Sequence, residues 1–139
     1  MKQLWLFFLS LLCSITLLTG CATDRANSLG NVRMVSVTDN GEKLSVTLTP
    51  AHLLALHAIA ISVHMQSLTA TKSTLHTVRI KERMSDMSMP VPTVTLTKGK
   101  FGDFVGTLVF VMTGSWTLIV TGTTTAGSFS QQFHVQIQS

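Results

Sequence analysis

Short runs in which apolar and polar residues alternate are the feature that most restricts how this chain can fold. In the stretch HAIAISVHM at positions 57–65, Ile59, Ile61 and Val63 occupy every second position, and smaller or polar residues lie between them. A period of two residues is typical of a half-buried β-strand, because successive side chains of a strand point to opposite faces of the sheet. Turn-forming residues separate several such runs, which predicts an all-β protein.

Turn signals mark where the first predicted strands begin and end. The tripeptide DNG at 39–41 is a strong tight-turn signal, so we expect residues 32–38 and 43–49 to pair as a hairpin. The composition of residues 51–60 also suits a short helix. The alternation favours a strand from Ala58 onward.

The rest of the chain continues this pattern and predicts the fold class. A total of seven or eight strands fits an immunoglobulin-like (Ig-like) β-sandwich of two sheets, although the Cys-Trp-Cys framework of true immunoglobulin domains is missing. An aromatic residue that enters a strand buries a large apolar area, so Trp116 is the expected core anchor between the sheets. The remaining predicted strands are the runs at 74–84, 93–97, 104–112, 115–122 and 129–138.

The N-terminus has the organisation of a secretory signal peptide. Met1, Lys2 and Gln3 form a short basic segment before the apolar run of residues 4–18. That run is about 15 residues long, near the upper end for the apolar part of a signal peptide. A membrane-spanning helix needs about 20 apolar residues, so an uncleaved transmembrane anchor is the less favoured alternative.

The tetrapeptide LTGC at 18–21 resembles the lipobox of bacterial lipoproteins. The resemblance implies cleavage before Cys21, diacylglycerol on its sulfur, and in many bacteria a further acyl chain on the freed amine. Two or more acyl chains anchor a protein stably to a membrane. Ala22 follows, where Asp would retain the protein at the inner membrane, so in a Gram-negative cell we expect an outer-membrane lipoprotein that faces the periplasm. The expected organisation is a signal peptide at 1–20, a lipidated tether at 21–31 and the sandwich domain at 32–139.

Lipidation would remove cysteine chemistry from the folded domain. Cys13 would leave with the signal peptide, and the sulfur of Cys21 would carry lipid. Disulfides, cysteine zinc sites and thiol nucleophiles are then excluded. The apolar core alone must stabilise the domain.

Basic residues outnumber acidic ones without forming a long run. The chain has 10 Lys and Arg against 6 Asp and Glu, and they are dispersed along the sequence. Arg79, Lys81 and Arg83 come nearest to a patch, and Glu82 interrupts them. We interpret these residues as a solvated strand face and expect no nucleic-acid partner.

The sequence carries no motif of a familiar catalytic mechanism. It has no G-x-S-x-G nucleophile elbow, no P-loop, no G-x-G-x-x-G and no H-E-x-x-H. The six acidic residues form no paired carboxylate site by local spacing. We therefore expect a protein that is not an enzyme.

Three methionines crowd a polar segment, MSDMSMP at 84–90. Thioether sulfur is a soft ligand that selects Cu(I), and methionine and histidine are the soft or intermediate ligands that remain without free thiols. The alternative interpretation is structural: Met87 and Met89 would fill the end of the sandwich beneath the loop, because methionine fills irregular gaps. The candidate copper ligands are Met84, Met87, Met89, His64 and His76.

Residues 84–120 resemble the C-terminal half of the FixH-like and YtkA-like domains. The shared pattern runs from a Met-Pro loop through a short strand to a glycine turn with an aromatic residue, then through an apolar strand ending in Met to Gly-x-Trp. The resemblance implies an Ig-like sandwich outside the cytoplasmic membrane, and some relatives act beside copper transport or cytochrome oxidase assembly. The matching residues are Met89, Pro90, Gly99, Phe101, Gly102, Phe104, Met112, Gly114 and Trp116.

Together these features predict a cell-envelope lipoprotein with a non-enzymatic accessory or binding sandwich. Copper ions or a copper-handling envelope protein are the expected partners. The alternative is a structural or protein-interaction module that holds no metal.

Overall fold

The chain folds into β-strands joined by turns and loops. The computed structural model describes residues 30–68, 73–89 and 92–139, and these ranges contain no helix. The all-β prediction is confirmed. The predicted signal peptide, Cys21 and Pro90 lie outside the described residues. The strands are β1 (Val32–Val37), β2 (Glu42–Thr49), β3 (Ala58–Ser67), β4 (Leu75–Met84), β5 (Thr93–Thr95), β6 (Thr97–Lys98), β7 (Phe104–Val109), β8 (Gly114–Thr124) and β9 (Gly127–Ile137).

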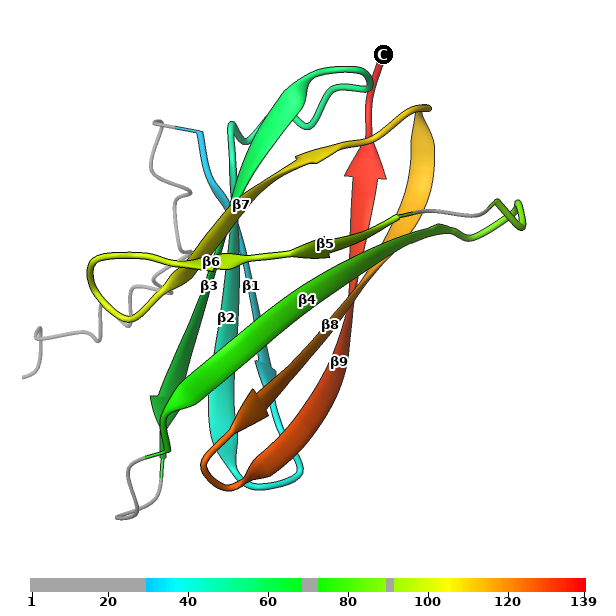
Figure 1. Ribbon diagram of the computed structural model, residues 1–139. Coiled ribbons are helices and arrows are strands. Elements are labelled where there is room, and N and C mark those ends of the chain that lie inside the picture. Colours follow the sequence, from blue (N-terminus) through cyan, green and yellow to red (C-terminus); the bar gives the residue numbers. More distant parts are fainter. Residues whose placement is uncertain (1–29, 69–72, 90–91) are drawn as a thin grey trace, which may run out of the picture.

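The strands form two antiparallel sheets that enclose one core (Figure 1). The five-stranded sheet has the order β1-β2-β3-β7-β6, and the four-stranded sheet has the order β5-β4-β8-β9. With β1 set aside, these orders match the A-B-E-D and C′-C-F-G sheets of immunoglobulin domains. The predicted Ig-like β-sandwich is therefore confirmed, with an added strand at the N-terminal edge.

The described residues form nine strands, because the predicted strand at 93–97 divides between the sheets. Its first part, β5, pairs with β4, and its continuation, β6, pairs with β7 of the other sheet. Leu96 lies between them with its side chain in the core, and its backbone N–H donates to the carbonyl of Val78 at 2.9 Å. Burial of this leucine carries the chain from one layer to the other, which an alternating pattern alone does not reveal.

The predicted first hairpin is present. β1 and β2 pair with Val37 opposite Lys43, and Gly41 takes a positive φ of 75° in the turn between them. A positive φ suits glycine because it lacks a Cβ. Residues 51–57 form turns rather than the alternative short helix, and Leu54 makes an isolated bridge to Gln138. The strand that follows begins at Ala58, as the alternation predicts.

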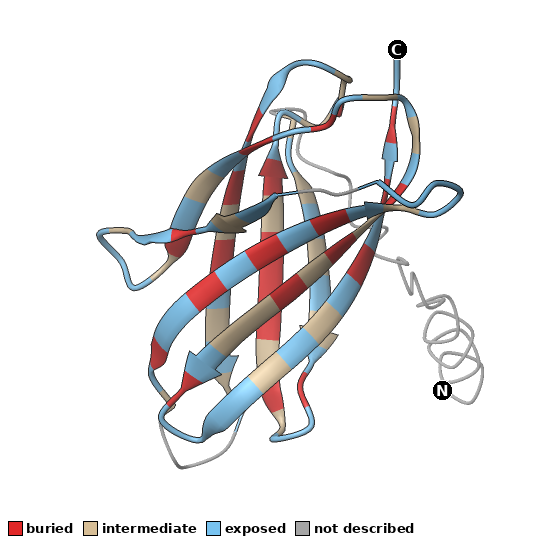
Figure 2. Cartoon of the chain, turned by 45° about the vertical axis from the view of Figure 1, so that its right-hand side comes forward, coloured by how far each residue is buried: buried red, intermediate tan, exposed pale blue. Residues whose placement is uncertain are grey.

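Trp116 anchors the core, as expected. Its side chain is 1% exposed, and its ring meets the ring of Phe110 edge-on with centroids 5.3 Å apart. The indole N–H donates to the carbonyl of Met112 at 3.0 Å, which satisfies the one polar atom of the buried ring. Figure 2 shows buried residues alternating with intermediate or exposed ones along the strands of both sheets. Within the described ranges no helix is long and apolar enough to span a bilayer.

Replacing Trp116 with alanine should lower the free energy of unfolding by about 3–5 kcal/mol, because the change leaves a large cavity between the sheets. Urea unfolding followed by circular dichroism measures the loss. The matched control is Val109→Ala on a strand surface, at a residue that is 47% exposed, where we expect a change of about 0.5 kcal/mol or less. Similar losses for the two variants would contradict the core role of Trp116.

Candidate functional site

The methionine segment begins at the end of β4, where Met84 packs on the core. Met84 lies opposite Trp116 in the β4–β8 pairing and is partly buried. A Cβ added to Gly114 would lie 2.9 Å from the terminal methyl of Met84, so the glycine leaves room for that side chain. Met84 therefore has a packing role at this end of the sandwich.

Met87 and Met89 behave differently, because both side chains are exposed. Their exposed fractions are 49% and 42%. The structural alternative, in which these two residues fill the end of the sandwich, is therefore wrong, and Met84 occupies that place instead. The exposed thioethers are free to meet solvent or a soft metal ion.

The structure does not bring the five predicted copper ligands together. His76 lies near the start of β4, eight residues before Met84, and a strand rises about 3.3 Å per residue, so the two are roughly 26 Å apart. His64 is exposed near the end of β3, in the other sheet. Figure 1 shows the end of β3 and the segment after β4 at opposite ends of the molecule. Among the described residues no group of three or more His, Cys, Asp or Glu could hold a metal ion.

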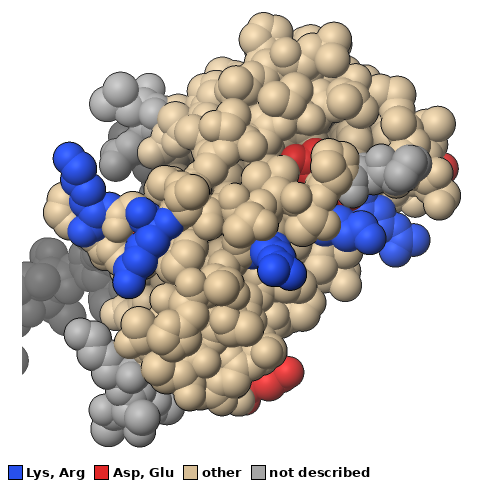
Figure 3. Space-filling model, viewed as in Figure 1, with Lys and Arg blue, Asp and Glu red and all other residues tan. Residues whose placement is uncertain are grey.

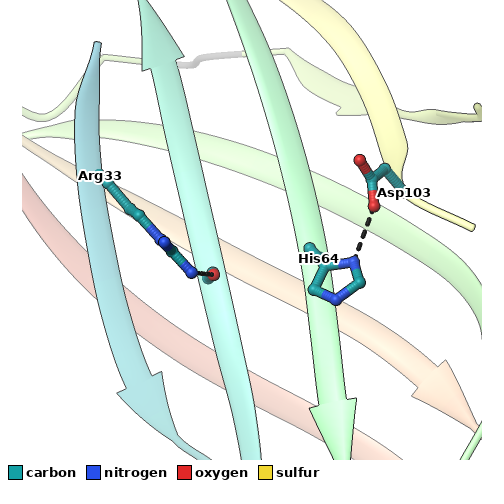
Figure 4. Close-up of polar contacts among 4 residues, drawn as sticks. Arg33, His64 and Asp103 are labelled. Atoms are coloured by element: carbon teal, nitrogen blue, oxygen red, sulfur yellow. Dashed lines mark hydrogen bonds and ion pairs between the residues drawn. The ribbon is translucent and has the colours of Figure 1, made fainter. Parts of the chain in front are cut away.

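His64 instead pairs with a carboxylate on the outer face of the five-stranded sheet. Its ring Nδ1 lies 2.7 Å from Oδ1 of Asp103, just before β7 (Figure 4). A carboxylate only accepts hydrogen bonds, so Nδ1–H donates and Nε2 remains outside this contact. The two residues are 39 positions apart, and no local sequence pattern could have predicted the pair.

The same face carries a second polar contact on the neighbouring strands. Arg33 of β1 donates from Nη2 to the hydroxyl oxygen of Ser45 at 3.2 Å (Figure 4). Ser45 lies opposite His64 in the β2–β3 pairing, so a serine, a histidine and an aspartate follow one another across the sheet. The hydroxyl of Ser45 accepts a hydrogen bond from Arg33. Activation of a serine nucleophile requires its O–H to donate to a base, and among the described residues no such hydrogen bond joins Ser45 to His64.

A charged surface lies on the other sheet, along β4. Val78, Ile80 and Glu82 of this strand are buried, and the alternate positions Arg79, Lys81 and Arg83 are exposed. The expectation that Glu82 interrupts the three cations is therefore wrong. It is adjacent in sequence, but its side chain points to the opposite face of the strand.

The three cations form an uninterrupted row, which we call the β4 cationic row and define as Arg79, Lys81 and Arg83. Two residues of a strand span about 7 Å, so the row is roughly 14 Å long. Figure 3 shows basic side chains over the central and right-hand parts of the view, where β4 runs. The row has uncharged neighbours and one histidine on the paired strands. These are Thr95, Thr121 and Ser130 beside Arg79, Thr93, Ile119 and Gln132 beside Lys81, and Thr117 and His134 beside Arg83.

Glu82 is a carboxylic acid on the inner face of β4. It is 5% exposed and lies opposite the buried Leu118 in the β4–β8 pairing. Within the described part of the chain no hydrogen bond or ion pair reaches its carboxyl group. Desolvation by burial raises the pKa of Glu82 from the ordinary 4.5 to about 7, since an apolar environment disfavours the charged form.

Comparisons with known proteins identify no relative of this chain. No protein-family model, curated protein or solved structure matches the chain. The resemblance to the FixH-like and YtkA-like domains therefore remains a prediction from the residues themselves.

The buried Glu82 predicts that the protein loses stability as the pH rises. Between pH 4.5 and about 7 the native state holds a proton on Glu82 that the unfolded chain has released, so the free energy of unfolding falls across this window and levels off above it. One pKa unit corresponds to about 1.4 kcal/mol, so the loss is up to about 3 kcal/mol, less where water reaches the carboxyl group.

Urea unfolding at a series of pH values measures this loss. Glu82→Gln should remove the loss and make the protein more stable than the parent above pH 7. The control Asp86→Asn, in the exposed segment after β4, should keep the slope of the parent. A parent protein whose stability is flat or rises between pH 5 and 7 would show that Glu82 is not desolvated.

Proposed function

We propose that the protein is a lipid-anchored binding module of the cell envelope. The observation that carries the proposal is the position of LTGC at 18–21, directly behind an apolar run of signal-peptide length. The first strand begins at Val32, so a short segment separates the acceptor Cys21 from the sandwich. In a Gram-negative cell, Ala22 after the cysteine favours the outer membrane, with the domain facing the periplasm.

The exposed chemistry of the sandwich supports binding as the role. The groups available on its surface are the β4 cationic row, the His64–Asp103 pair and the exposed Met87 and Met89. They lie on different sheets or loops, so they suit contacts with a partner more than a shared reaction centre. A non-enzymatic accessory role agrees with the missing catalytic motifs.

Copper binding is a second candidate function, with fewer ligands from this chain than the sequence predicted. The exposure of Met87 and Met89 favours it, because thioethers left free by the core are available to Cu(I). The site would then consist of these two side chains with further ligands from a partner or solvent. Met84, His64 and His76 take no part in it, since Met84 packs on the core and the histidines lie elsewhere.

Cys21→Ser should abolish lipidation, because the serine hydroxyl cannot replace the thiol that receives diacylglycerol. Mass spectrometry of the protein from bacterial membranes should show an acylated N-terminus at Cys21 in the parent and an uncleaved precursor in the variant. Ser28→Ala, in the same N-terminal segment, is the control and should be processed as the parent. A variant that still matures as a lipoprotein would overturn the proposed anchoring.

Met87→Leu combined with Met89→Leu should weaken Cu(I) binding by about tenfold or more, measured by competition with a Cu(I) chelator. Both side chains are exposed, so the unfolding free energy should change by about 0.5 kcal/mol or less. The control Met65→Leu, on β3 and partly buried, should leave the affinity unchanged. A dissociation constant of the parent weaker than about 1 μM, or one that the double change does not alter, would exclude this copper site.

A further inference from the structure

The β4 cationic row lies on a sheet face that carries no negative charge. The outward positions of β4, β5, β8 and β9 hold no Asp or Glu within the described ranges. The acid nearest in sequence, Glu82, points into the core, and Asp86 follows after the strand has ended. The field of the three cations is therefore not cancelled on their own face, so the face attracts anions.

The five-stranded sheet also carries cations, but a carboxylate lies among them. Arg33 and Lys43 lie on β1 and β2, Lys98 ends β6 and Lys100 follows in the next loop, and the carboxylate of Asp103 stands beside His64. The exposed positions of β7 are the uncharged Val105, Thr107 and Val109. The four-stranded sheet is therefore the one whose outward cations have no carboxylate beside them, and an anionic surface should prefer it.

The length of chain between Cys21 and the sandwich limits which anionic surface the domain can reach. The 11 residues at 21–31 reach at most about 40 Å when fully extended. The two sheets of a sandwich pack about 10 Å apart, so this length lets either outer face touch a bilayer to which Cys21 is attached. The local concentration of headgroups around a tethered domain is high.

The chain enters the sandwich through an edge strand of the five-stranded sheet, and not through the sheet that carries the cationic row. The chain enters through β1, and Ser36 of β1 donates a hydrogen bond to the side-chain oxygen of Gln131 on β9 at 2.7 Å. β1 and β9 are edge strands of the two sheets. The described part of the chain thus begins at an edge where the two sheets meet.

We propose that the outer face of the four-stranded sheet docks on the anionic phospholipid headgroups of the membrane that holds the lipid anchor. The inference rests on the proposed anchoring at Cys21. Basic residues near an anionic leaflet are attracted to it within about a Debye length. Docking turns the five-stranded sheet, with the His64–Asp103 pair, toward the aqueous compartment and makes that face the one a soluble partner meets.

Energy transfer from the protein to a headgroup-labelled lipid tests the orientation. The acylated full-length mature protein is placed in phosphatidylethanolamine vesicles with about one phosphatidylglycerol in four lipids. A fluorophore is attached through Gln132→Cys, exposed on the cationic face, or Thr107→Cys, exposed on the opposite face. Transfer should be stronger from position 132 than from position 107. The difference should vanish in phosphatidylcholine vesicles and in about 1 M NaCl, where the Debye length is about 3 Å.

Two triple variants with the same change of net charge complete the test. Arg79→Gln with Lys81→Gln and Arg83→Gln should abolish the difference between the two probe positions. Lys43→Gln with Lys98→Gln and Lys100→Gln should preserve it. Equal transfer from both positions in anionic vesicles, or a difference that survives high salt or the first triple change, would overturn the docking proposal.

The anchoring has a separate readout in the same preparation. With Cys13 removed and Cys21 acylated, the parent protein should take up no thiol-reactive dye, and its mass should include the acyl chains. Dye uptake at Cys21 would overturn the anchoring and this inference with it. An acylated protein without a preferred face would overturn the docking alone.

Discussion

The antiparallel pairing of β4 with β8 determines which side of the sheet each residue of β4 occupies, and the surface and the core both depend on it. The register places Ile80 opposite Val120 and Met84 opposite Trp116, so the inner faces of the two strands meet in the core. A shift by one residue would reverse every side chain. It would move Arg79, Lys81 and Arg83 inward, and burial of unpaired charges costs far more than a sheet of this size gains from pairing.

The same register explains why an ionisable group lies on the inner face of β4. Once three cations face outward, Glu82 between them must face inward, among apolar side chains. A protonated carboxyl group costs less to bury than an ionised one, so the pKa rises to about 7. The charged side chains on the outer face of β4 are therefore all positive. The carboxyl group on its inner face makes the stability of the protein depend on pH. Both properties arise from the alternation of one strand.

Much of the fold could be predicted because its signals are local. The DNG turn located the first hairpin, the alternation after Ala58 located β3, and a tryptophan at the start of an apolar strand identified Trp116 as core. The division of residues 93–98 between two sheets was missed, since it depends on the contact of Leu96 with the distant Val78. The His64–Asp103 pair was missed for the same reason.

The candidate site was predicted less well, because nearness in sequence does not give nearness in space. His76 and Met84 belong to one strand yet lie at its two ends, while Glu82 and its cationic neighbours face opposite ways. The alternation correctly predicted that Arg79, Lys81 and Arg83 lie on a solvated strand face. It was not applied to Glu82, whose side chain lies on the inner face and leaves the β4 cationic row uninterrupted.

Carbon-13 NMR of the carboxyl group measures the side-chain pKa of Glu82. It tests most directly which residues of β4 point into the sandwich and which point to solvent. The register described above predicts a carboxyl pKa raised to about 7, with the proton held by a buried acid. A carboxyl group that titrates near the ordinary 4.5 would place Glu82 in solvent. It would contradict the assignment of both the inner and the outer face of the strand.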